Sequence, residues 1–267
     1  MMRSRTTVQG AQATRRVGAC RDAEAGVALI VAVLATALVG GVVAALVIVT
    51  SADIFIAANV GAANEAFYAA EAVFERSLAE VRDAPALDAV LAGSASTFVD
   101  GAPGGARNLP DGSRIDLGQV ISQASCHKST PCSAADLDAT RADRPWGAMN
   151  PRWRLHSYGP LDPAASGIRS GVPVYVTAMV ADDPAETDGD PLKDGVRTGP
   201  NSNPGAGVLL LRGEAFGRRG AHRAIEATVI RRDIAARALW DAADPAVRGS
   251  PPPTLPVVQV VSWREVR

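Results

Sequence analysis

Two of the three cysteines lie close together in a polar segment, where they could form a disulfide. Cys126 and Cys132 are separated by five residues that include serine, threonine and proline, a composition typical of a loop. The third cysteine, Cys20, lies in an arginine-rich N-terminal stretch. If that stretch is removed, an even pair remains, as an oxidising compartment favours. The sequence therefore predicts a disulfide between Cys126 and Cys132, with free thiols as the alternative.

The same segment could in principle bind zinc, because His127 lies between the two cysteines. A structural zinc site takes four protein ligands, and Cys126, His127 and Cys132 supply only three. We therefore regard the disulfide as the better interpretation of this segment.

An acidic run at residues 182–190, followed by Asp194, is the second segment with chemical potential. Carboxylate oxygens on a glycine-containing loop are the ligands that calcium requires. The spacing differs from the twelve-residue EF-hand loop, because no bidentate glutamate stands at its last position. A solvated acidic turn between two strands is the more ordinary explanation, and the sequence assigns no metal and no other cofactor. If calcium is bound, the candidate ligands are Asp183, Glu186, Asp188 and Asp190.

Nothing in the sequence has the pattern of an enzyme active site. His127, His156 and His222 are far apart, and no nucleophile-elbow, zinc-protease or phosphate-cradling glycine motif is found. The formal net charge of −1 includes +3 before Val27, which leaves −4 for the rest of the chain. Such a remainder gives no clustered basic face for phosphate neutralisation. We expect a protein that is not an enzyme and does not bind nucleic acid.

These residues must be positioned by a chain that begins with a membrane segment. Residues 27–52 contain no charged side chain and exceed the roughly 20 residues needed to cross a bilayer. This is longer than the apolar core of an ordinary signal peptide, about 7–15 residues. Arginines precede the segment, so the positive-inside rule predicts a single span with the C-terminus outside. A buried helix of a soluble protein is the alternative.

Helix-compatible sequence continues past the apolar run without a proline. Five apolar residues recur at three- and four-residue steps, which places them on one helix face. Pro85 then ends the helix, with residues 83–84 as its frayed end. We expect one long helix that is apolar all round at first and amphipathic afterwards. The residues of the amphipathic face are Phe67, Ala70, Phe74, Leu78 and Val81.

Beyond Pro85 the chain is rich in glycine, proline, serine and aspartate, with four strand-like runs. These runs are residues 172–181, 207–216, 223–232 and 256–266. The second and third are joined by a short segment and predict a hairpin. Strands close in sequence favour an antiparallel meander. We predict an α+β fold in which an antiparallel sheet with irregular loops packs on the amphipathic half of the long helix.

Two segments of the long helix, taken together, resemble a known family. Residues 26–31 (GVALIV), the apolar run after them, and residues 66–72 (AFYAAEA) are similar to the N-terminal region of minor type IV pilins of the PilX class. They also resemble, less closely, the K-type minor pseudopilin of type II secretion. Residues 257–265 look like the closing strand of such proteins.

The resemblance implies how the N-terminus is processed. In that family a prepilin peptidase cuts after the glycine, which implies Gly26 as the last leader residue and Val27 as an N-methylated first residue. Major pilins have a glutamate at the fifth mature position, where this chain has Val31. That departure fits a specialised minor subunit better than the main filament subunit.

The resemblance also sets an expected organisation and function. It implies a cytoplasmic leader at residues 1–26, a helix at 27–84 (membrane-spanning at 27–52, amphipathic at 53–84) and an exported α+β domain of pilin-like fold at 85–267. The expected function is a minor pilin that helps to initiate, prime or tip a type IV pilus, a structure used in cell adhesion. The implied location is the inner membrane and then the pilus or pseudopilus, and the implied partners are other major and minor pilins. Alternatives are a pseudopilin of a type II secretion system or a single-span anchored binding domain unrelated to filaments.

Overall fold

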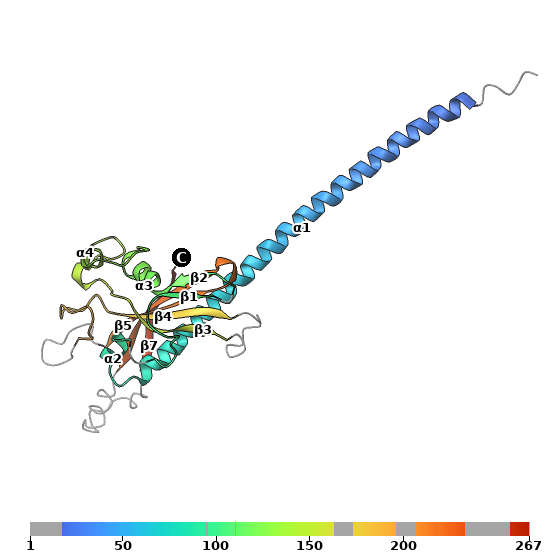
Figure 1. The fold of residues 1–267 in the computed structure, drawn as a ribbon. Helices are drawn as coiled ribbons and strands as arrows, with labels where there is room; N and C mark the ends of the chain where they lie inside the picture. The colour runs from blue at the N-terminus through green and yellow to red at the C-terminus, as the bar shows by residue number, and fades with distance from the viewer. Residues whose placement is uncertain are drawn as a thin grey trace, which may run out of the picture. The chain divides into compact units, whose positions relative to one another are not determined.

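The computed structural model describes residues 18–93, 96–109, 111–162, 173–195, 207–232 and 257–266. The chain divides into two compact units, residues 1–58 and residues 59–267. Helix α1 (Gly18–Asp83) belongs to both: its first part is the described portion of the first unit, and its end belongs to the second (Figure 1). The second unit also contains every other helix and strand among the described residues.

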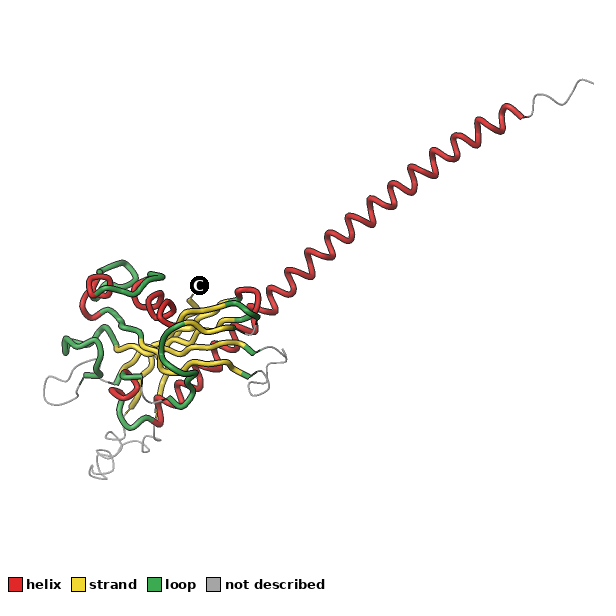
Figure 2. The backbone as a smooth tube through the Cα atoms, viewed as in Figure 1, coloured by secondary structure: helices red, strands yellow, loops and turns green. Residues whose placement is uncertain are grey.

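The second unit is built on a five-stranded antiparallel sheet. Its strands lie in chain order, each paired with the next, so that the sheet is a simple meander (Figure 2). Strands that are neighbours in sequence commonly pair with one another, although only the connection between β5 and β6 is short here. The strands are β3 (Arg154–Leu161), β4 (Val174–Asp182), β5 (Val208–Phe216), β6 (His222–Arg232) and β7 (Val257–Val266).

Strand β4 is buried along its whole length, and its two faces pack against different elements. Val176 and Val180 join core clusters that contain side chains of α1, whereas Tyr175 and Met179 join the cluster around α3 (Leu117–Cys126). Alternate side chains of a strand point to opposite faces of the sheet. The sheet is therefore covered on both faces, which explains why β4 is an almost unbroken apolar run.

The end of α1 supplies the helix that covers one face of the sheet. Ala70, Phe74 and Val81 are buried there, and Phe67 and Leu78 are partly buried against the same clusters. This confirms the helix face predicted from the apolar spacing. The helix ends at Asp83, as Pro85 predicts. Its face toward the sheet is dominated by alanine, which lets helix and sheet approach closely.

Short elements complete the second unit. Helix α2 (Leu87–Leu91) follows α1 and adds Leu87, Val90 and Leu91 to the same core. Two three-residue strands form a separate antiparallel pair, and two 3₁₀ turns and a short helix occupy connections. Their bounds are β1 (Ala106–Asn108), β2 (Arg114–Asp116), α4 (Ala134–Asp138), η1 (Gly147–Met149) and η2 (Arg218–Gly220).

The observed α+β arrangement agrees with the fold class expected from the sequence in its coarse form. All four predicted strand runs are strands, and the predicted hairpin is formed by β5 and β6. Two features differ. Strand β3 and helix α3 lie in a region where no regular element was predicted, and α1 begins at Gly18, before the predicted start at Val27. The charged residues before Val27 are compatible with a helix, so its start follows local propensity.

Candidate functional site

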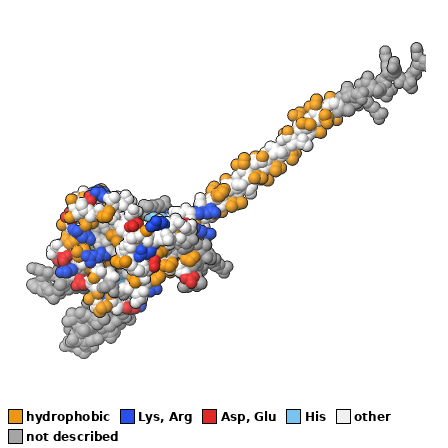
Figure 3. Space-filling view, viewed as in Figure 1, with side chains coloured by type: hydrophobic (Ala, Val, Ile, Leu, Met, Phe, Trp, Pro, Cys, Tyr) orange, Lys and Arg blue, Asp and Glu red, His pale blue; other side chains and the backbone are white. Residues whose placement is uncertain are grey.

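Residues 27–52 of α1 expose their apolar side chains on all sides. The larger ones from Val27 to Val49 are between 53% (Val43) and 70% (Ile48) exposed, and Figure 3 shows the apolar surface of this helix in orange. The helix is long and apolar enough to cross a membrane, near the N-terminus of the chain. So large an apolar surface marks contact with lipid or with another protein. The chain is compatible with a single-pass membrane protein.

The few hydroxyl groups in this apolar segment bond within the helix. Thr36 Oγ1 donates to the Val33 carbonyl at 2.9 Å, and Ser51 Oγ donates to the Val47 carbonyl at 2.7 Å. Thr50 Oγ1 likewise donates to the Leu46 carbonyl, one turn earlier in the helix. Each polar hydrogen is thus satisfied without water, as a hydrocarbon environment requires.

The predicted processing site lies inside α1. Gly26 and Val27 are both helical and exposed. A Cβ placed at Gly26 would meet no atom within 4 Å, so packing does not require glycine at this position. A peptidase that needs an extended backbone would have to unwind the helix here, and glycine lowers the cost of doing so.

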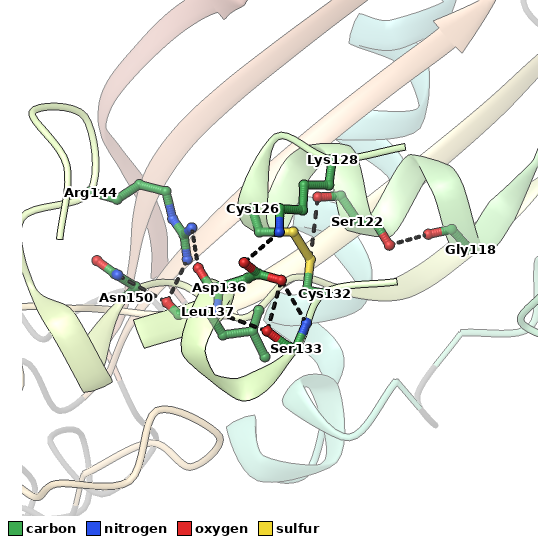
Figure 4. Close-up of a disulfide and its surroundings, with 10 residues drawn as sticks. All are labelled: Gly118, Ser122, Cys126, Lys128, Cys132, Ser133, Asp136, Leu137, Arg144 and Asn150. Carbon is green, nitrogen blue, oxygen red and sulfur yellow. Dashed lines mark hydrogen bonds and ion pairs between the residues drawn. A yellow bond between two sulfur atoms is a disulfide. The ribbon is translucent and has the colours of Figure 1, made fainter. Parts of the chain in front are cut away.

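The predicted disulfide is present. Cys126 at the end of α3 is bonded to Cys132, with 6.2 Å between their Cα atoms (Figure 4). This confirms the pairing and excludes zinc binding by the two thiolates. His127 points elsewhere: its Nε2 lies 2.7 Å from Oδ2 of Asp143.

Polar contacts hold the chain that follows the disulfide. Ser133 caps α4 by a capping box with Asp136, and Asp136 also accepts a hydrogen bond from Lys128 (Figure 4). The Lys128 bond, together with those from Ser133, holds the pKa of Asp136 well below its usual range. The Leu137 carbonyl accepts hydrogen bonds from Arg144 and Asn150, each at 3.0 Å. Helix α4 buries none of its residues, so the disulfide and these bonds replace an apolar core.

Three of the four calcium ligands predicted in the acidic run do not come together in the structure. Asp183 Oδ1 accepts a bond from the Ala185 amide, and Asp188 Oδ1 accepts one from the Asp190 amide. Asp190 also forms an ion pair with Lys193 at 3.5 Å. These three carboxylates therefore make local turn contacts on or near the surface. The candidate that lies in a cluster of carboxylates is the fourth, Glu186.

Glu186 meets two carboxylates from other parts of the chain. Oxygens of Asp182, Glu186 and Asp194 all lie within 4.8 Å of one another. Asp182 is the last residue of β4 and is 2% exposed, and Glu186 is 3% exposed. Glu186 Oε2 accepts a hydrogen bond from the Gly195 amide at 2.8 Å, and Asp194 Oδ1 accepts one from the Gly207 amide at 2.7 Å.

The electrostatics of this cluster disfavour three ionised carboxylates. Burial and the charge of Glu186 raise the pKa of Asp182 to about 8. The charges of Asp188 and Asp194 raise the pKa of Asp182 further. The Asp183 amide lowers it, although this amide does not form a hydrogen bond of good geometry with Asp182. Burial and the charge of Asp194 likewise raise the pKa of Glu186 to about 7. The cluster therefore takes up either protons or a cation near neutral pH.

Two other carboxylates of the second unit, Glu80 and Glu214, lie against basic side chains. His156, which is fully buried on β3, has its Nε2 2.9 Å from Glu80 Oε2 on α1. Glu214 on β5 pairs with Arg212 and with His222, whose Nε2 lies 3.0 Å from Glu214 Oε2. Burial raises the pKa of both glutamates, but their hydrogen-bonded and charged partners outweigh it and lower the pKa overall.

A cavity of about 420 Å³ lies beside β5, β6 and β7. Its lining includes Arg212, Glu226 and Arg264, and Glu226 is bonded to both arginines. Trp153 and Trp263 contribute aromatic surface, and Trp263 is 62% exposed. Aromatic side chains beside a few polar groups are typical of ligand pockets.

Sequence reasoning noted the acidic run but did not single out Asp182 and Asp194. Asp182, the last residue of β4, has the same parity as Val176 and Val180, whose side chains pack against α1. That parity was the available signal that its carboxylate would be buried. Asp194 carried no such signal, because a loop of unknown path separates it from Asp182. The burial of His156 and its contact with Glu80 were not predicted either, because β3 was not predicted.

No family model matches this chain, and no curated protein or solved structure shows significant similarity to it. Its function is therefore argued from its residues and its fold.

Proposed function

We propose that this protein is a minor pilin of the PilX class, a non-catalytic subunit that helps to initiate, prime or tip a type IV pilus. The observation that carries the proposal is the change of character along α1. Its residues 26–57 are exposed all round, whereas residues 59–83 bury one face against an antiparallel sheet. A subunit that waits in a membrane and then assembles through the same helix needs both surfaces.

The segment at 66–72 that resembles the family also supports an assembly role. Ala66, Ala69 and Ala70 are buried against the sheet. Tyr68 is 58% exposed and Glu71 is exposed on the other side of the helix. The buried alanines set the distance between helix and sheet, and the outward pair is available to neighbouring subunits.

The proposed route to the filament starts with cleavage after Gly26 by a prepilin peptidase and N-methylation of Val27. Residues 27–52 span the inner membrane with the C-terminal domain outside. The Cys126–Cys132 disulfide supports this orientation, because such bonds persist in oxidising compartments. Val31, in place of the glutamate of major pilins, suits a minor subunit.

Two alternatives share part of this support. A minor pseudopilin of a type II secretion system has the same helix and the same processing. A single-span anchored binding domain is favoured by the cavity beside Trp263, which a purely structural subunit does not require. The pseudopilin differs from our proposal in its partners, and the anchored binding domain differs because it retains the leader.

The test is the intact mass and N-terminal sequence of the protein extracted from its native membrane. We expect a chain that begins at Val27 with one added methyl group. The variant Gly26→Val should retain the leader, because a branched side chain at that position obstructs an extended backbone in the peptidase. Gly41→Val is the matched control: it also meets no atom within 4 Å and should be processed normally.

A wild-type chain that retains its arginine-rich leader would contradict the proposal and leave the anchored binding domain. If processing occurs, photocrosslinking from residues 27–52 identifies the neighbours. Pilus subunits would support our assignment, and secretion-system subunits would replace it with the pseudopilin.

A further inference from the structure

We propose that Asp182, Glu186 and Asp194 form a calcium-binding site at the end of β4. Each contributes a carboxylate oxygen to a group in which all the oxygens lie within 4.8 Å of one another. That is the separation expected of ligands around one ion at about 2.3–2.6 Å from each oxygen. The site is distinct from the four ligands that the sequence suggested, with only Glu186 in common.

The burial of Asp182 without a hydrogen-bond partner is a second observation that points to a bound cation. Its side chain is 98% buried, and neither carboxylate oxygen has a hydrogen-bond partner among the described residues. An ionised carboxylate without a partner is among the least favourable groups to bury. Its oxygens belong to the same group as those of Glu186 and Asp194, so a cation held there would compensate the buried charge of Asp182.

Among the described residues, carboxylates of the loop and of helix α2 add negative charge around the cluster. Within the loop these are Asp188, which raises the pKa values of Asp182 and Glu186, and Asp183, which raises that of Glu186. Helix α2 brings another carboxylate, since Asp88 Oδ1 accepts a hydrogen bond from the Asp194 amide at 3.1 Å. Arg231 of β6 directs its guanidinium to the Val81 carbonyl of α1, at 3.1 Å. Lys193 is paired with Asp190.

The chemistry of the ligands selects the ion. All three are carboxylates, and no histidine or cysteine of the described residues belongs to the group. Oxygen-only sites suit hard cations, whereas zinc and copper sites contain nitrogen or sulfur. Calcium accepts an irregular shell completed by water and backbone carbonyls, but magnesium requires a near-ideal octahedron. A site formed between a strand end and a loop fits calcium better.

The bound ion would fasten the connection between β4 and β5. Asp182 ends β4, Glu186 lies early in the loop, and Asp194 lies near the end of its described part. The two loop carboxylates are already oriented by the amides of Gly195 and Gly207. Calcium would thus tie this loop to the end of β4. Millimolar calcium outside the cell would fill a site with a dissociation constant on the order of 10⁻⁴ M, a setting that rests on the proposed export of this domain.

The experiment uses the full chain in detergent at pH 7.5, stripped with EGTA and titrated with calcium. We expect one calcium per chain by equilibrium dialysis and a rise of several degrees in the thermal unfolding midpoint. Magnesium at equal concentration should give a clearly smaller rise. The readout is calcium binding, so it is independent of N-terminal processing and of any pilus.

Two variants make the test specific. Asp182→Asn keeps the shape but removes the buried charge, and it should weaken calcium binding at least tenfold. Without calcium it should unfold at a higher temperature than the stripped wild type, so a folding failure is not the expected outcome. Asp190→Asn changes a neighbouring loop carboxylate outside the cluster and should bind calcium like the wild type.

The proposal is overturned if the wild-type protein binds no calcium at 5 mM, which would mean that the carboxylates are neutralised by protons alone. It is also overturned if Asp182→Asn binds calcium as tightly as the wild type. Equal loss of binding in Asp182→Asn and Asp190→Asn would place the ion on the outer loop and overturn it too.

Discussion

At the scale of single residues, buried charges are handled in two contrasting ways. Glu80 pairs with Arg76 and faces His156, while Glu214 pairs with Arg212 and faces His222, so that their negative charge is compensated within the chain. Asp182 is as deeply buried as Glu214, and more so than Glu80, but it meets other carboxylates. Compensated pairs hold elements together, whereas an uncompensated group creates an affinity for a cation. This contrast is why the acidic cluster, and not the ion pairs, is the candidate binding site.

The disulfide gives a residue-scale prediction. Replacing both Cys126 and Cys132 by serine should lower the free energy of unfolding by about 2 kcal/mol, because the bond closes only a short loop in the unfolded chain. Urea denaturation of the full chain in detergent measures the loss. Cys20→Ser is the control and should leave stability unchanged.

Thiol labelling provides a second readout for the same bond. The unreduced, unprocessed chain should react with maleimide only at Cys20, and reduction should expose two further thiols. Labelling of three thiols without reductant would contradict the bond.

At the scale of elements, the central contact is that between α1 and β5. Gly213 on β5 lies directly under the helix: an added Cβ would be 2.7 Å from the Ala70 carbonyl oxygen and 3.1 Å from Phe74 Cβ. The obstacle includes helix backbone, which cannot move aside like the end of a long side chain. Alanines on the helix and glycine on the strand therefore permit one close approach, and core clusters extend from it in both directions.

Gly213→Ala should accordingly destabilise the protein by about 1–3 kcal/mol, as expected for overpacking. Gly217→Ala, in the connection that follows β5, is the matched control. Its backbone is extended, and a Cβ there would make only ordinary contacts at 3.6 Å or more. We expect this control to stay within about 0.5 kcal/mol of the wild type. Thermal and urea unfolding of the two variants compare them directly, and equal stability would show that helix and sheet are not in close contact.

At the scale of the whole molecule, two sets of carboxylates give stability opposite dependences on pH. The pKa values of Glu80 and Glu214 are lowered on folding. Their contribution is present above their unfolded pKa, near 4.5, and is lost as the pH falls further. The pKa values of Asp182 and Glu186 are raised on folding, to about 8 and about 7. Their protonated forms are favoured in the folded state, so stability is lost as the pH rises from about 4 toward 8.

The calcium-free protein should therefore be most stable near pH 5. Between pH 5 and pH 8 the free energy of unfolding should fall by an amount on the order of 3 kcal/mol. Urea denaturation in EGTA across this range measures the fall, and Asp182→Asn should reduce it. Excess calcium should largely remove it, because a bound cation keeps the carboxylates ionised in the folded state. A stability that rises steadily to pH 8 in EGTA would contradict this account.

Much of the architecture could be predicted from the sequence because it depends on local patterns. The apolar run at 27–52 needs no tertiary context to be recognised as long enough to cross a membrane. The spacing of Phe67, Ala70 and Phe74 identified the face of α1 that packs on the sheet. The hairpin of β5 and β6 and the pairing of Cys126 with Cys132 followed from short separations, where few partners compete.

Other features became visible only in the tertiary structure. Strand β3 ends in Gly159-Pro160-Leu161, which weakens its local strand signal, and pairing with β4 stabilises it. The carboxylates of the proposed calcium site could not be identified from the sequence for a related reason. The sequence gathers Asp183, Asp188 and Asp190 around Glu186, but proximity along a loop does not bury a side chain. The fold buries Asp182 at the end of a core strand and returns Asp194 to it across the loop, so the chemistry of the site was decided by which carboxylates lose their water.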